Sequence, residues 1–271
     1  MPSLPPALHR IPRLLHWTRA STWMLSGFLA LLGLIGYVWW PLAEEYLSTY
    51  NPALPFWIQF DWLLLGIFLG MSLLIMAGAD LRRDALIAVV GLAGGLVIES
   101  WGTQTSLWTY YTLERPPLWI IPAWPIATLS IDRIQRLLLR GTRRLPESLF
   151  HWGYAVVFPF FLGQMLAFVW PTRHLSLTQM ALLLCLFLVG TPQGNRRTLL
   201  LVFLAGTGLG YFLERWGTTR LCWTYYTLET PPFFAVMAHG MAAVAFWRVC
   251  ALYPFLRREL GRRWRRARPA N

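Results

Sequence analysis

Two glutamates, Glu99 and Glu214, are the residues whose types and spacing best suit chemistry in this sequence. Each ends an apolar run and stands two residues before a Trp-Gly-Thr triplet, so we expect both at the edge of a membrane's hydrocarbon core. A carboxyl group is costly there and usually faces a cavity or a partner. If the two groups lie close together, one can hold a proton while the other is ionised, as a general acid and a general base. The alternative, equally open, is an ion pair with Arg115, Arg215 or Arg220.

Asp61 and His239 are further candidate catalytic groups on the side of the membrane where both glutamates are expected. Asp61 enters the second apolar segment, and His239 lies early in the last one, where the first copy of an internal repeat has Trp124. A single helical histidine more often packs through a hydrogen bond than binds a ligand, and that alternative stays open. The three cysteines lie far apart, and no metal-ligand or nucleotide-binding spacing occurs. The sequence therefore predicts neither a metal site nor a cofactor.

An internal repeat surrounds the two glutamates with aromatic residues. Residues 101–117 and 216–232 are identical at 12 of 17 positions, without a gap and at a constant offset of 115, which indicates duplication. The alternation in the shared Trp-Thr-Tyr-Tyr-Thr segment favours an extended conformation. The alternative is that these rings only gather at the membrane interface. As candidate substrate-binding residues we take Trp101, Trp108, Tyr110, Tyr111, Trp124, Trp216, Trp223, Tyr225 and Tyr226.

The elements that must position these residues are apolar helices. Hydrophobic residues make up 56% of the 271-residue chain and charged residues only 13%, which excludes a disordered chain and a soluble enzyme. A helix needs about 20 apolar residues to cross a bilayer. About eight segments approach that length, namely 20–42, 57–78, 84–101, 117–139, 148–170, 175–191, 198–214 and 232–256.

The predicted fold is therefore an all-α polytopic membrane protein with two parallel four-helix repeats. An even number of spans per repeat makes both copies enter the membrane in the same direction, so the repeats should face each other across a pseudo-twofold axis. The first repeat covers residues 20–140 and the second covers 141–256, with a basic segment 1–19 before them and an Arg-rich tail 257–271 after them. We expect Pro116-Pro117 and Pro231-Pro232 to open the helix that follows each motif.

Arginine placement predicts the orientation. All 24 basic residues are Arg, and 20 of them fall on one side of the predicted spans. Cytoplasmic loops collect positive charge, so both termini should be cytoplasmic, in the cell membrane, with both motif copies at the opposite surface. The tail 257–271 could also bind anionic lipids. The favoured interpretation is that it only fixes the orientation of the protein in the membrane. The charge gives no reason to expect nucleic acid binding, and the oligomeric state is left open.

The motif resembles the integral-membrane carotenoid biosynthesis proteins, which include carotenoid hydratases. The second copy has Arg220 where the first has Thr105, and the family's Phe-Gly element is absent. The residues that carry the resemblance are Glu99, Gly102, Thr105, Trp108, Tyr110, Tyr111, Pro122 and Trp124 in the first copy, and Glu214, Gly217, Trp223, Tyr225 and Tyr226 in the second. The resemblance implies that an acid protonates a double bond of a carotenoid or other isoprenoid lipid. Aromatic faces then hold the carbocation until water or a second double bond captures it.

A second class of function stays open beside the enzyme. Paired carboxylates in parallel repeats also suit a proton-coupled carrier, and a lipid-binding factor or a structural subunit of a membrane complex would need no catalysis. The space between the helices that carry Glu99 and Glu214 discriminates these functions. An elongated apolar tunnel favours the lipid enzyme, a water-filled cavity at the midplane favours the carrier, and a solid interface favours the subunit.

Overall fold

The computed structural model describes residues 17–190 and 195–267, with side chains up to residue 253, and these residues are mostly helical. This confirms the all-α class. The helices are α2 (Arg19–Val38), α3 (Trp40–Ser48), α4 (Trp62–Met76), α5 (Leu81–Gln104), α6 (Ala123–Gly141), α7 (Glu147–Phe168), α8 (Ser176–Cys185), α9 (Arg196–Thr219) and α10 (Phe233–Ala267), with short 3-10 segments η1 (Phe56–Ile58) and η2 (Trp170–Thr172) and a π-helical segment η3 (Leu186–Gly190).

Five of these helices are long and apolar enough to cross a membrane, fewer than the eight expected. They are α2, α5, α7, α9 and the Phe233–Tyr253 part of α10. Helix α4 has only 15 residues, and α8 continued by η3 is equally short. Helix α6 carries Asp132, Arg133 and Arg136 within 19 residues, so it is too charged to meet the same standard. Each expected span coincides with a helical segment, but the structure supports a membrane protein with five candidate spans among its described residues.

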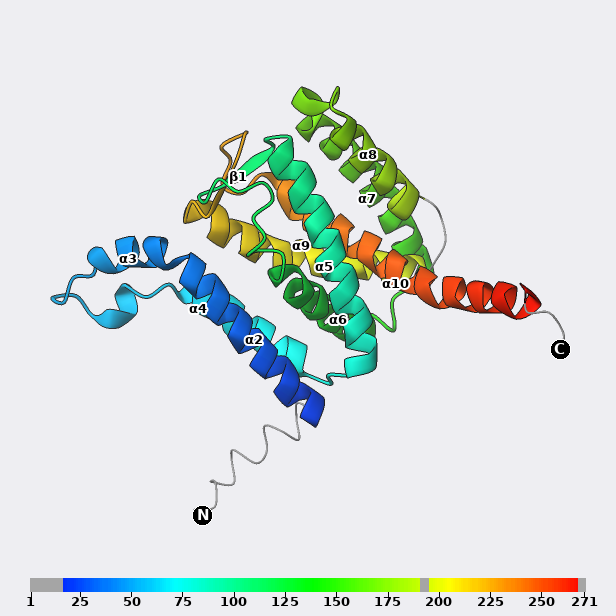
Figure 1. The fold of residues 1–271 in the computed structure, drawn as a ribbon, viewed down its shortest axis with the longest axis horizontal. Helices are drawn as coiled ribbons and strands as arrows, with labels where there is room; N and C mark the ends of the chain where they lie inside the picture. The colour runs from blue at the N-terminus through cyan, green and yellow to red at the C-terminus, as the bar shows by residue number, and fades with distance from the viewer. Residues whose placement is uncertain (1–16, 191–194, 268–271) are drawn as a thin grey trace, which may run out of the picture.

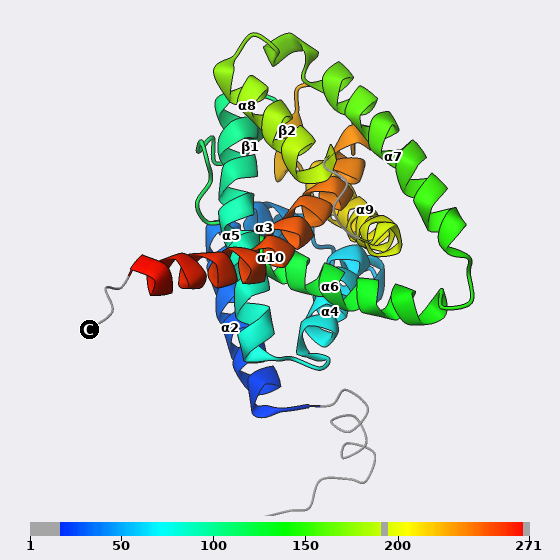
Figure 2. The same ribbon diagram turned by 90° about the vertical axis from the view of Figure 1, so that its right-hand side faces the viewer.

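Four helices form the centre of the fold. Helix α5 packs on α6 and α10, and α9 packs on the same two helices. The pair α2 and α4 lies on one flank of this centre, and α7 and α8 lie on the opposite flank (Figure 1). Figure 2 shows that α5 and α9 run in different directions, since α9 is seen along its axis while α5 runs up the picture. Helices α5 and α9 are therefore inclined to each other, and each is followed in the chain by its own motif strand.

Helices α5 and α9 have matching boundaries. Each has 24 residues, and their first and last residues are offset by 115. The side chain of Asp80 caps α5 by accepting the backbone N–H of Arg82, and Asn195 caps α9 by accepting that of Arg197. Such caps satisfy backbone donors that a helix N-terminus leaves free. Both helices of the duplicated sequence thus begin with the same kind of side-chain N-cap.

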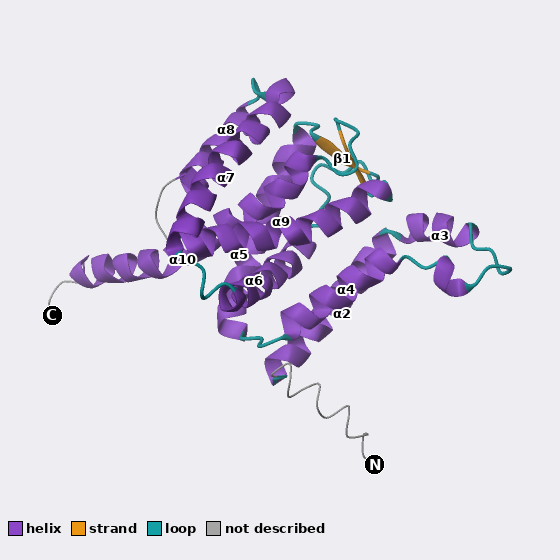
Figure 3. Cartoon of the chain, turned by 180° about the vertical axis from the view of Figure 1, so that it is seen from behind, coloured by secondary structure: helices purple, strands orange, loops and turns teal. Residues whose placement is uncertain are grey.

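A two-stranded ribbon joins the two halves. Strand β1 (Trp108–Tyr110) pairs antiparallel with β2 (Trp223–Tyr225), above the ends of α5 and α9 (Figure 3). The register places Thr109 opposite Thr224, which are equivalent residues of the two copies. Each Trp of one strand accordingly faces the Tyr of the other. This confirms the extended conformation predicted for the motif, and it places a local twofold between the two threonines.

Glycines let each strand fold back onto its own helix. A Cβ atom on Gly102 would lie 1.8 Å from the Trp108 ring, and one on Gly217 would lie 1.9 Å from Trp223. Before each strand a residue adopts a left-handed conformation, Ser106 at φ 59° and Leu221 at φ 56°. The chain therefore reverses at the helix end, and the returning indole lies against the helix that carries the glutamate.

Two expected boundaries differ from the observed ones. The prediction that Pro116-Pro117 opens a helix is wrong, because α6 begins only at Ala123. Pro231-Pro232 does immediately precede α10. The basic tail expected to begin at residue 257 continues α10 to Ala267, and the segment before residue 17 lies outside the described residues.

Candidate active site

Three neutral donors surround the carboxylate of Glu99. This side chain is only 4% exposed. Its Oε2 accepts the indole N–H of Trp108 at 3.0 Å, and its Oε1 accepts the Tyr110 hydroxyl at 2.9 Å and the Trp124 indole N–H at 3.2 Å. A buried carboxylate needs such partners because burial removes its hydration. Two of the donors come from the two ends of β1 and the third from the start of α6, and the chain reversal after α5 brings β1 back to Glu99.

Glu214 has a nearly identical environment and is also 4% exposed. Its Oε2 accepts the indole N–H of Trp223 at 3.0 Å, and its Oε1 accepts the Tyr225 hydroxyl at 2.9 Å. The third partner is His239, whose Nε2 lies 2.8 Å from Oε1. The two sites therefore differ chemically at one position, where the first half has Trp124.

This single difference changes the chemical nature of the third partner of the glutamate. An indole N–H only donates, whereas an imidazole nitrogen can gain or lose a proton near neutral pH. The rings of Trp124 and His239 stack on each other with centroids 5.7 Å apart and planes at 18°. Glu99 and Glu214 are thus connected through this stack. Among the described side chains they do not hydrogen-bond to each other.

The expected alternative of arginine ion pairs does not occur among the described side chains. Arg215 donates to the carbonyl of Thr230, and Arg220 pairs with Asp61 at 3.1 Å. Of the arginines whose side chains are described, none lies within salt-bridge distance of either glutamate. His239 and Glu214 form an ion pair only when the imidazole is protonated. The carboxylates are therefore held by indole, phenol and imidazole groups.

Both glutamates line one cavity of about 590 Å³. This volume falls in the range of about 300–1,000 Å³ usual for small-molecule sites. Apart from the glutamates, their partners and a cysteine, the lining is apolar. The lining follows the repeat, since ten pairs offset by 115 contribute to it: Ile98 and Leu213, Glu99 and Glu214, Trp101 and Trp216, Trp108 and Trp223, Tyr110 and Tyr225, Ile120 and Ala235, Ala123 and Ala238, Trp124 and His239, Ile126 and Met241, and Ala127 and Ala242.

Trp101 and Trp216 line the cavity but bind partners in the opposite half. The Trp101 indole donates to the hydroxyl of Thr178 in α8 at 3.3 Å, and the Trp216 indole donates to Asp61 at 3.0 Å. Asp61 also caps α4 by accepting the backbone N–H of Leu64. These contacts give Asp61 a structural role. The structure does not place Asp61 among the described residues that line the cavity.

Tyr111 and Tyr226, expected to bind substrate, are also absent from this lining. The Tyr111 hydroxyl donates to the carbonyl of Val38 at the end of α2, and that of Tyr226 donates to the carbonyl of Phe168 at the end of α7, at 2.7 Å. These tyrosines fasten the flanking helices to the motif. The predicted residues that do gather at the cavity are the glutamates, His239, all five predicted tryptophans, Tyr110 and Tyr225.

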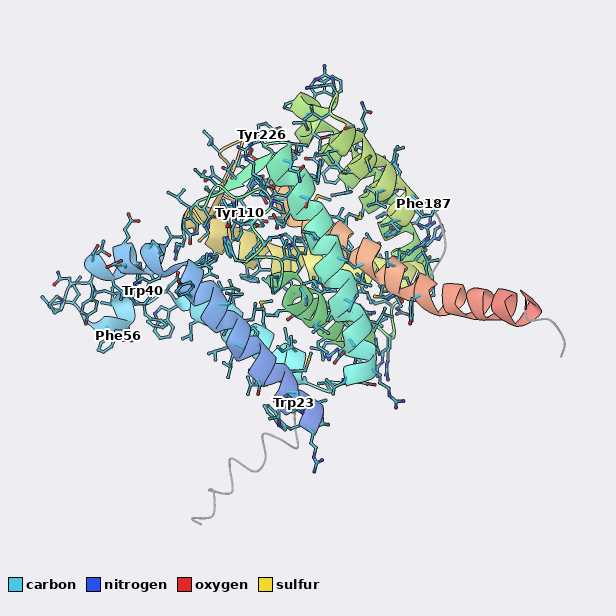
Figure 4. All side chains as sticks on the ribbon, viewed as in Figure 1. Trp23, Trp40, Phe56, Tyr110, Phe187 and Tyr226 are labelled. Carbon is cyan, nitrogen blue, oxygen red and sulfur yellow. The ribbon has the colours of Figure 1, made fainter. Side chains whose placement is uncertain are left out.

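The two cavity tyrosines are held as donors. Burial raises the pKa of Tyr110 and of Tyr225 well above the usual range, and the neighbouring carboxylates raise it further. Both phenols therefore keep their protons at neutral pH and donate to the glutamates. Tyr110 lies inside the fold, whereas Trp23, Trp40 and Phe56 lie at its periphery (Figure 4).

Two features of the structure were not anticipated. Arg133 forms a buried ion pair with Asp84 at 2.6 Å, at the end of α5 far from the motif; an acidic residue inside an apolar segment was the available signal. Trp39 lines the cavity and stacks on Trp216 with centroids 4.6 Å apart. Its buried indole N–H has no acceptor within the described chain, so it can donate to a bound molecule.

Comparison with known proteins adds no further assignment. Scans against family models, curated proteins and solved structures each found no match. Within the residues described, no three His, Cys, Asp or Glu side chains form a group that could hold a metal ion. The absence of a metal and a cofactor stays a prediction, and the function must be argued from the site.

Proposed function

We propose that this protein is a membrane enzyme that adds a proton to a carbon–carbon double bond of a carotenoid or other isoprenoid lipid, leading to hydration or ring closure. One observation carries the proposal. Two buried carboxylates, each bound by three side chains, face the same otherwise apolar cavity, and only Glu214 has an imidazole among its partners. An oily site with a few convergent polar groups suits a lipid that reacts at one point.

The proposed setting is the cell membrane, crossed eight times, with both termini cytoplasmic and the motif at the other surface. The arginine distribution supports this orientation. Helices α4 and α8 with η3 would cross as short spans with polar flanks that reach the interfaces. The different directions of α5 and α9 suit parallel repeats, because a twofold along the membrane normal tilts equivalent helices in opposite directions (Figure 2).

In the first proposed step, the Glu214–His239 pair gives its proton to one carbon of the double bond. The π electrons form the new C–H bond, and the neighbouring carbon becomes a tertiary carbocation. The Glu99 carboxylate and the faces of Trp101 and Trp216 stabilise the positive charge from fixed positions in the same cavity. Because the donors to Glu99 already point at it, little reorganisation accompanies the appearance of charge.

In the second proposed step, a nucleophile quenches the cation and the pair regains its proton. Water attack followed by proton loss to Glu214 gives a tertiary alcohol. Attack by an internal double bond, followed by loss of a ring proton to Glu214, gives a cyclic alkene. Both outcomes balance in atoms and electrons without an oxidant or a reductant, in accord with the prediction that no cofactor is needed.

The apolar lining favours this proposal over the other functions considered. An ion carrier needs a hydrated path, whereas the polar groups here cluster beneath the strand pair. A purely structural subunit needs no cavity between its repeats. A lipid-binding factor would use the same cavity without chemistry, so product formation is the measurement that separates it from an enzyme.

The test compares Glu214→Gln with Glu99→Gln. In each variant an amide N–H replaces an acceptor that faces fixed donors, so both carry a similar folding penalty and each controls for the other. Membranes containing each variant are supplied with an acyclic carotenoid, and products are identified by mass spectrometry. We expect Glu214→Gln to lower product formation by about 10²- to 10⁴-fold and Glu99→Gln to lower it less. Wild-type product formation by Glu214→Gln would refute the proposal.

A further inference from the structure

The cavity opens sideways between α5 and α8. Of the described residues that line it, four are exposed: Val89 at 62%, Val97 at 52% and Leu184 at 44%, together with Ala93. Val89, Ala93 and Val97 are spaced by four residues, so they share one face of α5. The exposed lining is thus concentrated at one place rather than spread around the cavity.

Helix α8 supplies the facing wall of this opening. Ala181, Leu184, Cys185 and Leu188 also line the cavity, and their spacing of three and four residues places them on one face of α8 and η3. Helices α5 and α8 are in contact, so the two faces form one groove. The walls of this α5–α8 groove carry no charged side chain, which suits a hydrocarbon chain and not a lipid headgroup.

The groove is closed at the end beside the glutamates. Trp101 lies four residues after Val97 and continues the same face, and its indole donates to Thr178, which is 0% exposed. Thr178 in turn donates to the Thr172 hydroxyl at 3.0 Å. The Trp101 ring also meets the Trp108 ring edge-on, at 5.7 Å and 89°. From Trp101 to Val89 the helix rises about 18 Å, at about 1.5 Å per residue.

The equivalent face of α9 does not contribute to the cavity. The residues of α9 equivalent to Val89, Ala93 and Val97 are Leu204, Gly208 and Phe212, and none of these three lines the cavity. The exposed lining described here therefore belongs to the α5–α8 side, although the glutamate sites themselves are repeated.

We propose that the α5–α8 groove is the entry and binding site for one linear isoprenoid chain taken directly from the bilayer. The chain lies along α5 with its terminal double bond against the ring of Trp101, next to the glutamate site. The groove opens through exposed apolar residues of α5, a candidate membrane span, and of the apolar helix α8, and it is continuous with the cavity that holds the glutamates. A chain dissolved in the membrane is therefore the occupant that it fits. The choice of an isoprenoid over an acyl chain rests on the proposed function, because only a double bond can use the aromatic and acidic groups at the closed end.

The experiment measures occupancy without requiring a reaction. The full chain is reconstituted in phosphatidylcholine vesicles with a linear isoprenoid alcohol that carries a photoactivatable diazirine, and labelled peptides are mapped by mass spectrometry. Val97→Trp fills the groove, and Phe212→Trp is the matched control, since Phe212 is 50% exposed at the equivalent position. We expect labelling of α5 and α8 in the wild type and in Phe212→Trp, and a fall of about tenfold in Val97→Trp.

Ala93→Phe against Gly208→Phe provides a second matched pair, because a Cβ on Gly208 would meet no atom within 4 Å. Equal labelling of both members of each pair would overturn the proposal. Competition by excess phospholipid as effective as that by unlabelled isoprenoid would also overturn it, by identifying an ordinary acyl-chain site. If labelling is normal but no isoprenoid gives a product, the proposed binding site stands and only the proposed enzyme activity is refuted.

Discussion

The Glu99 and Glu214 sites have nearly the same geometry and different chemical capacity. In both, an indole lies 3.0 Å from one carboxylate oxygen and a phenol lies 2.9 Å from the other. Only the third partner differs, Trp124 in one half and His239 in the other. The duplicated segments thus hold a carboxylate in two equivalent settings, and one difference in sequence gives the second setting an imidazole in place of an indole.

A second difference lies where each half meets the flanking helices. Trp101 binds the uncharged hydroxyl of Thr178, whereas Trp216 binds Asp61, which also pairs with Arg220. Breaking the hydrogen bond between Trp101 and Thr178 separates no charges. Breaking the one between Trp216 and Asp61 would also disturb the ion pair of Asp61 with Arg220. The contact that involves no ion pair lies on the α5–α8 side, through which we propose that the isoprenoid chain enters.

The largest expected effect comes from making the two sites alike. His239→Trp gives the second half the partner set of the first and removes the imidazole next to Glu214. We expect product formation from an acyclic carotenoid to fall by about 10²- to 10⁴-fold, the usual contribution of general acid–base catalysis. Product is measured by mass spectrometry in membranes with matched protein content.

Trp124→His is the reciprocal variant and serves as the control for His239→Trp. It changes the same stacked pair but leaves Glu214 and His239 in contact, so activity should stay within about tenfold of the wild type. If both variants lose activity equally, the stack and not the histidine matters, and the assigned difference between the halves is wrong.

A smaller effect is expected where the halves are structurally the same. Gly102→Ala and Gly217→Ala each place a Cβ less than 2 Å from the indole that binds a glutamate. Each should lower the free energy of unfolding by about 1–3 kcal/mol, since the ring must shift. Thermal unfolding in detergent measures this. A marked difference between the two variants would show that the two returning strands are not equivalent.

An effect of similar size is expected for the two buried phenols. Tyr110→Phe and Tyr225→Phe each remove one hydrogen bond to a carboxylate and should cost about 1–3 kcal/mol at neutral pH. Burial raises the pKa of both phenols, so as the pH rises they ionise in the unfolded chain before they ionise in the folded protein. Their contribution to the free energy of unfolding is therefore complete below about pH 10 and is lost as the pH rises above it. Each variant should show a shallower alkaline loss of melting temperature than the wild type. An unchanged alkaline slope in either variant would contradict the burial assigned to that phenol.

The repeat made the motif predictable, but not its contacts. Identity at a fixed offset identified Glu99, Glu214 and their aromatic neighbours, and alternation indicated the extended segment that became β1 and β2. The sequence could not show which rings bind the glutamates, because that depends on the chain reversal at Ser106 and Leu221. Tyr111 and Tyr226 illustrate this limit, since alternation along the strand turns them away from the neighbouring Tyr110 and Tyr225.

Length and apolarity predicted the helices better than their role in a membrane. Helix α6 was expected as a span, yet Asp132, Arg133 and Arg136 reduce its apolar content, and Arg133 is buried against Asp84. Contacts between distant segments were also out of reach. Thr178, which closes the α5–α8 groove, has no counterpart in the motif and no distinctive spacing.

The Thr109–Thr224 register has a consequence for how such a chain could be divided. Each half provides one edge of a two-stranded ribbon and leaves its own strand unpaired without the other half. A gene encoding one half alone would therefore give a product with an unpaired strand edge, to which a second copy of the same strand is the natural complement. Two fragments separated at the link between Gly141 and Glu147 could likewise reassemble from separate transcripts, with the ribbon as their point of recognition.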